Sequence, residues 1–321
     1  MNRLPFLILL AALLIISGCS LFATVRESQL KAHKDYVESF GGLDMEMVWI
    51  PGGTFRMGSY LTAEQVAARY GGPVNQSGDE YPLHAVTLDG FWMGKYEVTN
   101  RQFRCWAPKH SSVGWSALSD FSLDGDQQPV VRVSLEEAKR FCRWLSNGTN
   151  RRYSIPTEAQ WEYACRGNTQ CVRYWGDDDE VMGYYANVGD QTIKPFLAPL
   201  LEGREEYEGW DVVPTNDGYV VAAPVGSFQA NPFGLYDMIG NVWEWCLDAY
   251  DPDFYSRSPE TNPVNMVHTE AAKARDQYGR EQFPTRGGSW MNISFCQRAA
   301  IRMETYDHQP PEVGFRVVRI P

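Results

Sequence analysis

Residues 231–245 read Asn-Pro-Phe-Gly-Leu-Tyr-Asp-Met-Ile-Gly-Asn-Val-Trp-Glu-Trp. Two glycines, Gly234 and Gly240, interrupt this apolar and aromatic run, which suits neither a plain strand nor a plain helix. Glycine permits backbone conformations that other residues resist, so the Gly-Asn pair predicts a tight bend with inward-pointing carbonyl groups. Asp237 and Glu244 then place carboxylates among residues that we expect to be buried.

These oxygen atoms have two explanations. The two carboxylates and the carbonyls between them could converge on a hard cation, because Ca²⁺ takes roughly six to eight oxygen ligands and tolerates irregular geometry. The carboxylates could instead accept hydrogen bonds from the backbone amides of a buried turn. The stretch by itself leaves both alternatives open.

Five further segments occur in a fixed order around this one. They are Gly-Gly-Thr-Phe-Arg-Met-Gly-Ser (52–59), Tyr-Glu-Val-Thr-Asn (96–100), Ile-Pro-Thr-Glu-Ala-Gln-Trp-Glu-Tyr-Ala-Cys-Arg-Gly (155–167), Arg-Gly-Gly-Ser-Trp (286–290) and Gly-Phe-Arg-Val-Val (314–318). Together the six motifs resemble the signature of the formylglycine-generating enzyme family, also called the sulfatase-modifying-factor family. The resemblance implies an irregular α+β fold of the C-type lectin-like kind, low in regular secondary structure and stabilised by calcium.

Composition narrows the class of protein. Of 321 residues, 44% are hydrophobic and 21% charged, which is typical of a soluble globular protein. The 11 tryptophans and 17 tyrosines could fill the core of a loop-rich fold or line a groove. The net charge of −11 and the lack of a basic cluster with interleaved aromatics argue against a nucleic-acid partner.

The N-terminus is predicted to be a lipoprotein signal peptide over residues 1–18. Arg3 precedes an apolar run, 6–16, that is too short for a comfortable membrane span. The run ends in Ile-Ser-Gly-Cys, which resembles the bacterial lipobox, so we expect Cys19 to be acylated; the alternative is a signal peptide with an incidental cysteine. Several acyl chains anchor a protein stably. Ser20 favours the outer membrane, facing the periplasm or the surface.

Residues 19–43 are predicted to be a lipidated N-terminus and stalk. Apolar residues spread among charged ones favour a modest amphipathic helix there, which Gly41 and Gly42 would end. The globular domain is accordingly predicted to cover residues 44–321. Within it, short apolar runs predict a strand at 47–50 and a pair of strands at 84–88 and 91–93.

Helix starts are marked by Ser or Thr with Glu or Gln three residues later. This spacing is typical of a capping box, in which side chain and backbone satisfy each other's free groups. It predicts helices that begin after Thr99, Ser134 and Thr157. The second helix should bury one face: Leu135, Ala138, Phe141, Cys142 and Leu145. From 168 to 288 regular pattern largely vanishes, and metals or buried aromatics would have to hold that stretch.

The resemblance implies two structural calcium sites made of oxygen donors. The first would use the side chains of Asn187 and Asp217 and the carbonyls of Val188 and Tyr219. The second would use the side chains of Asp237 and Glu244 and the carbonyls of Gly240 and Val242.

The cysteines decide the expected chemistry. Family members that oxidise a substrate cysteine carry two cysteines five residues apart after Arg-Gly-Gly-Ser, and these thiolates hold Cu(I). Here only Cys296 follows that motif, and Asn292 stands near the expected first cysteine. Met291 offers a thioether without thiolate charge, so copper is not expected. Cys296 is the one catalytic candidate, or else a buried or disulfide-bonded residue; a Cys165–Cys171 bridge is one of several open pairings.

Two functions follow. The first is a non-catalytic binding or scaffold lipoprotein of the cell envelope, with a protein, peptide or glycan partner in the former substrate groove. We expect that groove at Trp243, Ser289, Trp290, Asn292 and Tyr306. The alternative is an oxidoreductase of the formylglycine-generating type with altered active-site chemistry. Copper binding that depends on Cys296 would favour the second.

Overall fold

A computed structural model describes residues 33–114, 118–201, 212–266, 281–307 and 309–321. The predicted signal peptide and Cys19 lie outside these residues. Among the residues it does describe, no helix combines the length and the apolar character needed to cross a membrane.

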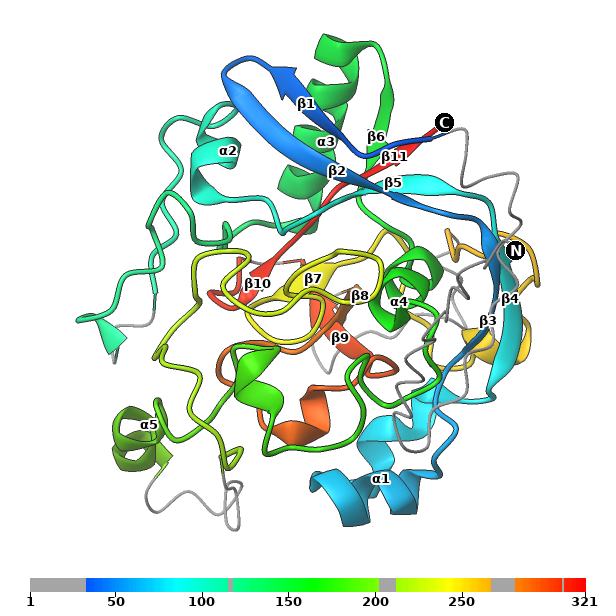
Figure 1. Ribbon diagram of the computed structural model, residues 1–321, viewed down its shortest axis with the longest axis vertical. Helices are drawn as coiled ribbons and strands as arrows, with labels where there is room; N and C mark the ends of the chain where they lie inside the picture. The colour runs from blue at the N-terminus through cyan, green and yellow to red at the C-terminus, as the bar shows by residue number, and fades with distance from the viewer. Residues whose placement is uncertain (1–32, 115–117, 202–211, 267–280, 308) are drawn as a thin grey trace, which may run out of the picture.

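A five-stranded antiparallel sheet occupies one end of the molecule, with α3 (Leu135–Thr149) beside it (Figure 1). Its strands, in spatial order, are β1 (Tyr36–Phe40), β2 (Leu43–Ile50), β5 (Phe91–Gly94), β11 (Val318–Ile320) and β6 (Arg152–Ser154). The sheet is curled, so that side chains from its two edge strands reach each other: the Tyr36 hydroxyl on β1 lies 2.7 Å from the Tyr153 hydroxyl on β6.

The predicted boundary at residue 44 is wrong. Residues 36–40 form β1, which pairs with β2 from Tyr36↔Met47 to Phe40↔Leu43. Gly41 and Gly42 form the turn between these strands, both with positive φ, instead of ending a helix. The stalk prediction therefore fails for residues 36–43, since alternate side chains of β1 pack inward against the sheet and α3.

Two smaller sheets complete the strands. The hairpin of β3 (Gly53–Met57) and β4 (His84–Leu88) stands apart from a central four-stranded sheet. The central sheet runs β10 (Val313–Gly314), β7 (Trp243–Trp245), β8 (Gln282–Arg286) and β9 (Met303–Tyr306). The strands predicted at 84–88 and 91–93 exist but do not pair with each other. β4 pairs with β3 and β5 pairs with β2, because the chain passes from one sheet to another between β4 and β5.

All three predicted helix starts are confirmed. Reciprocal capping boxes at Thr99, Ser134 and Thr157 open α2 (Asn100–Arg104), α3 and α4 (Glu158–Arg166). A fourth box at Thr62 opens α1 (Ala63–Tyr70). The five residues predicted on the inner face of α3 are all buried.

The stretch 168–288 is largely irregular, as expected. Its described elements are α5 (Lys194–Leu201), β7, β8 and the 3-10 turns η3 (Met182–Tyr184) and η5 (Phe254–Ser256). Elsewhere η1 (Val74–Glu80) and η6 (Ser294–Cys296) are also 3-10 turns. Cys165 is a buried free thiol, so the bridge to Cys171 is not formed.

Buried ion pairs join the motif segments. Glu158 and Glu162 on α4 both bind Arg286 of β8, at 3.1 and 2.5 Å. Arg302 binds Glu158 at 2.8 Å, and Arg166 binds Glu162 at 2.8 Å. These side chains are almost completely buried. The charged residues of two motifs, 155–167 and 286–290, thus serve the packing of α4 on the central sheet.

Candidate functional site

The expected catalytic segment follows β8 and leads into η6. Asn292 has its amide oxygen fixed by two donors, the Ser289 N–H at 2.9 Å and the Ser289 hydroxyl at 2.7 Å. Gln297 donates to the Ser289 carbonyl at 2.9 Å and closes the turn. At the place expected for the first thiolate, the chain therefore has an amide engaged in holding a loop.

Cys296 is a free thiol that packs against the main core cluster. Burial raises the pKa of this thiol to about 12, and Arg298 beside it lowers it only in part, because Arg298 is bidentate to Glu80. A thiol rather than a thiolate is then present at neutral pH, and a thiol is a poor ligand for Cu(I).

The predicted groove residues are mostly core residues. Trp243, Ser289 and Trp290 have exposed fractions of 4%, 0% and 1%. Asn292 and Tyr306 keep part of their surface accessible. Three of the predicted groove residues therefore offer no side-chain surface to a partner, because flat aromatic rings that could have lined a groove fill the interior instead.

The residues of the first expected calcium site do come together. Asp217 accepts hydrogen bonds from the Val188 N–H at 2.7 Å and the Tyr219 N–H at 2.8 Å. Burial raises the pKa of Asp217 to about 7. The Asn187 side-chain oxygen is buried without a hydrogen-bond partner. Each carboxylate oxygen still has a lone pair, so this donor set fits a hard cation.

The second expected site is divided. Asp237 fits, since its Oδ1 is buried without a hydrogen-bond partner while Oδ2 accepts from the Gly226 N–H at 2.7 Å. Glu244 is instead bidentate to Arg316, at 2.6 and 2.7 Å, and also accepts from Trp161 Nε1 at 2.9 Å. Burial, and to a smaller degree the charge of Glu244, raises the pKa of Asp237, so the two carboxylates lie near each other although Glu244 is engaged by Arg316. Gly240 and Asn241, both with positive φ, form the bend between them.

Sequence reasoning missed Glu97. Its Oε1 accepts from Asn241 Nδ2 at 3.0 Å, and its Oε2 is buried without a hydrogen-bond partner. Asn241 Oδ1 also accepts a hydrogen bond of 3.3 Å from the Asn187 side chain, so one amide links Glu97 to a residue of the first expected site. The signal was present, because Glu97 belongs to the motif at 96–100, but nothing in that motif pointed to a site 140 residues later.

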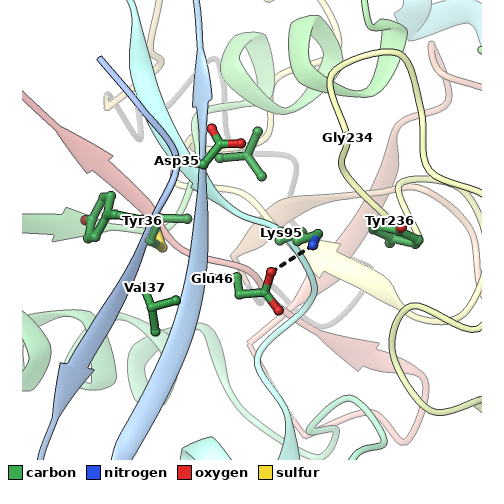
Figure 2. Close-up of a pocket in the computed structure, with 9 residues that line it drawn as sticks. Asp35, Tyr36, Val37, Glu46, Lys95, Gly234 and Tyr236 are labelled. Atoms are coloured by element: carbon green, nitrogen blue, oxygen red, sulfur yellow. Dashed lines mark hydrogen bonds and ion pairs between the residues drawn. The ribbon is translucent and has the colours of Figure 1, made fainter. Parts of the chain in front are cut away.

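Lys95 and Tyr236, which are close in sequence to Glu97 and Asp237, line a pocket of about 480 Å³. Figure 2 shows Lys95 between Glu46 of β2 and Tyr236 on the opposite loop. Lys95 Nζ lies 2.7 Å from Glu46 Oε2. The same nitrogen lies 5.4 Å from the ring centroid of Tyr96 and 5.6 Å from that of Tyr236. The remaining lining residues are Asp35, Tyr36, Val37, Met47, Val48 and Gly234.

The described residues contain no compact cluster of metal-binding side chains. Within the described ranges, no group of three or more His, Cys, Asp or Glu side chains is placed to hold an ion. Any cation at the sites above would therefore need neutral oxygens beside one or two carboxylates.

The curled sheet, the irregular middle and the capped helices define an α+β domain of the C-type lectin-like kind. A profile of the family described as "Sulfatase-modifying factor enzyme 1-like domain" matches residues 38–321, and the chain belongs to this family. The resemblance and the fold class predicted from the sequence are confirmed.

The relatives of this chain carry names that describe different functions. A formylglycine-generating enzyme of Thermomonospora curvata is 29% identical over 323 residues, covering 86% of this chain and 93% of that protein. The chaperone protein LppX of Paenibacillus barcinonensis is 28% identical over 303 residues, covering 82% and 91%. The structure of PvdO from Pseudomonas aeruginosa matches with a TM-score of 0.64 at 25% identity, covering 87% of this chain and 95% of that one.

Proposed function

We propose that this protein is a lipid-anchored component of the cell envelope that binds a protein or peptide partner and does not form formylglycine. The observation that carries the proposal is the engaged amide of Asn292 at the place expected for the first thiolate, with a neutral, packed Cys296 behind it. A fold family supports many activities, so the site and not the fold must decide. The relative named as a chaperone supports a binding role.

The partner site that we assign is the pocket of Figure 2. Its lining includes the apolar residues Met47 and Val48, the ion pair of Lys95 and Glu46, and the aromatic residue Tyr236. Val37 stands at its rim and is 55% exposed. Pockets that bind peptide side chains generally join an apolar body to a few placed polar groups.

Site-specific photo-crosslinking tests this assignment. A photoreactive residue at Val37 should give a defined crosslinked product in living cells, whereas the same residue at Val113, which is 60% exposed on another loop, should give none. The product should sediment with membranes and become soluble when Cys19→Ser is added. Equal crosslinking from both positions would contradict the assignment of the partner site to this pocket. A crosslinked product that contains carbohydrate would show that the partner is a glycan and not a protein.

The alternative is an oxidoreductase with altered active-site chemistry, which the names of the enzyme relatives favour. A Cu(I) titration separates the two functions. We expect no tight one-to-one copper binding, because a neutral thiol and a thioether lack the charge of a thiolate pair. Cys105→Ser is the matched control for Cys296→Ser, since both cysteines are free and partly exposed. Copper binding that is lost only in Cys296→Ser, with oxygen consumption, would establish the oxidoreductase.

A further inference from the structure

An edge strand exposes backbone groups that need a partner, and this chain covers two of its sheet edges with its own residues. At the edge strand β6, the Ser146 hydroxyl of α3 accepts from the Tyr153 N–H at 2.9 Å and lies 3.2 Å from the Tyr153 carbonyl oxygen. Beside β4, the Thr87 N–H donates to the Glu260 carbonyl at 2.7 Å, and the Asn262 N–H donates to the Thr87 carbonyl at 2.9 Å. Both edges are thereby closed to a further strand.

The other edge of the five-stranded sheet is β1, and its hairpin geometry decides which backbone groups point outward. A two-residue loop joins β1 to β2, so the residues next to the loop, Phe40 and Leu43, form the first hydrogen-bonded pair. Hydrogen-bonded and non-hydrogen-bonded pairs alternate along an antiparallel ladder. Val37 and Ser39 therefore direct their N–H and C=O groups away from β2. The residue opposite Val37 agrees with this, since the Glu46 carbonyl accepts a hydrogen bond of 2.9 Å from the other side of β2.

The outward groups of β1 have no partner in the part of the chain that the structure describes. No hydrogen bond there joins the backbone of Val37 or Ser39 to another strand, a loop or a side chain. Both residues are exposed, Val37 by 55%, so solvent reaches this strand. Edge strands are commonly guarded by a proline, a lysine or a bulge, but β1 reads Tyr-Val-Glu-Ser-Phe and keeps a regular register from end to end. Such an edge is a template for one more strand.

We propose that the partner binds as an added strand, in which an extended peptide segment pairs with the free edge of β1 through the backbone groups of Val37 and Ser39. This inference rests on the partner site proposed above and deepens it. The pocket of Figure 2 begins at the same strand, because Asp35, Tyr36 and Val37 line it. In this mode of recognition main-chain hydrogen bonds supply affinity, and the side chains next to the strand supply selectivity.

Charge indicates which segment fits this edge. The exposed side chains of the β1–β2 hairpin include Asp35, Asp44 and Glu46, and the whole chain carries a net charge of −11. A second copy of this chain would bring the same acids to the edge, and like charges on adjacent strands are destabilising. The added segment therefore belongs to a different protein. We expect it to be neutral or basic, with an apolar residue beside Val37.

Ser39→Pro tests the added strand. Proline removes the outward N–H of Ser39 and places its ring at the pairing edge, but it breaks no hydrogen bond to β2, so the domain should still fold. With the photoreactive residue at Val37, the amount of crosslinked product should fall about tenfold or more in Ser39→Pro. Ser39→Ala is the matched control, because it also loses the hydroxyl contact with Asp44, at 2.6 Å, but keeps the backbone donor. Its product should be unchanged.

The outcomes separate this inference from the proposed function. A product that is as abundant in Ser39→Pro as in Ser39→Ala, with both proteins folded by circular dichroism, would overturn the added strand and leave the pocket as the partner site. A product with the mass of two copies of this chain would assign the edge to a second copy and would equally overturn it. The absence of any product from Val37 would contradict the partner site and the added strand together.

Hydrogen exchange decides the matter if Ser39→Pro does not fold. In the free full-length protein the Val37 and Ser39 amides should exchange about tenfold or more faster than those of Glu38 and Phe40, which donate to β2. In the purified crosslinked product the Ser39 amide should exchange about tenfold or more slowly than in the free protein. A Ser39 amide that is already protected in the free protein, or one that is equally unprotected in the product, would refute strand addition.

Discussion

Replacing Glu158 by alanine should lower the free energy of unfolding by about 3–5 kcal/mol, because removing one partner of a buried ion pair leaves the other charge uncompensated. Glu158 binds two fully buried arginines, Arg286 at 3.1 Å and Arg302 at 2.8 and 2.9 Å. Arg302 and then Arg286 hold the pKa of Glu158 below its usual value despite burial. Urea denaturation of the purified protein at pH 7 measures the loss.

The control is Glu136→Ala on the surface of α3. Glu136 also binds two arginines, Arg140 and Arg143, but all three side chains are about half exposed. Exposed pairs of this kind contribute at most about 1 kcal/mol. Equal losses in the two variants would refute the role assigned to the buried network. Because the folded pKa of Glu158 is lowered, its contribution is present above the unfolded pKa and is lost as the pH falls through the folded one.

Gly240→Ala should prevent stable folding or lower the free energy of unfolding by about 3 kcal/mol or more, because backbone strain and overpacking act together. Gly240 has φ of +80°, and an added Cβ would lie 2.3 Å from the Asn187 carbonyl oxygen. Gly234→Ala is the matched control in the same stretch. Its φ is +82°, and no heavy atom lies within 4 Å of the added Cβ. In Gly234→Ala the free energy of unfolding should fall by only about 1–2 kcal/mol, because alanine is strained in the left-handed backbone conformation.

Thermal and urea unfolding of both glycine variants separate the two contributions. If Gly240→Ala were as stable as Gly234→Ala, the backbone at Asn187 would have moved away from the added Cβ at little energetic cost. In that case the bend at 240 would not constrain the stretch on which both expected cation sites depend.

Local signals predicted local structure well. The capping boxes fixed three helix starts, since a box needs only residues three apart. The Gly-Asn bend was also correct, because Gly240 and Asn241 both adopt positive φ.

Long-range partners were not predictable from those signals. Glu97 reaches Asn241 across 144 residues, and Glu244 meets Arg316 across 72. From the sequence, a carboxylate near a glycine bend is equally consistent with a cation ligand and with the partner of an arginine. The prediction of the groove residues was wrong for a related reason. Tryptophans such as Trp243 and Trp290 can line a surface groove or fill a core, and composition does not distinguish the two positions.

The place of β11 has a consequence for how the chain folds. This strand, residues 318–320, lies inside the five-stranded sheet, between β5 and β6. Neither neighbour has its full set of ladder partners until residue 320 has left the ribosome. Contacts of such large sequence separation form slowly, because long loops must close first. The pairings of β11 with β5 and β6 are therefore expected to be late steps in the folding of this domain.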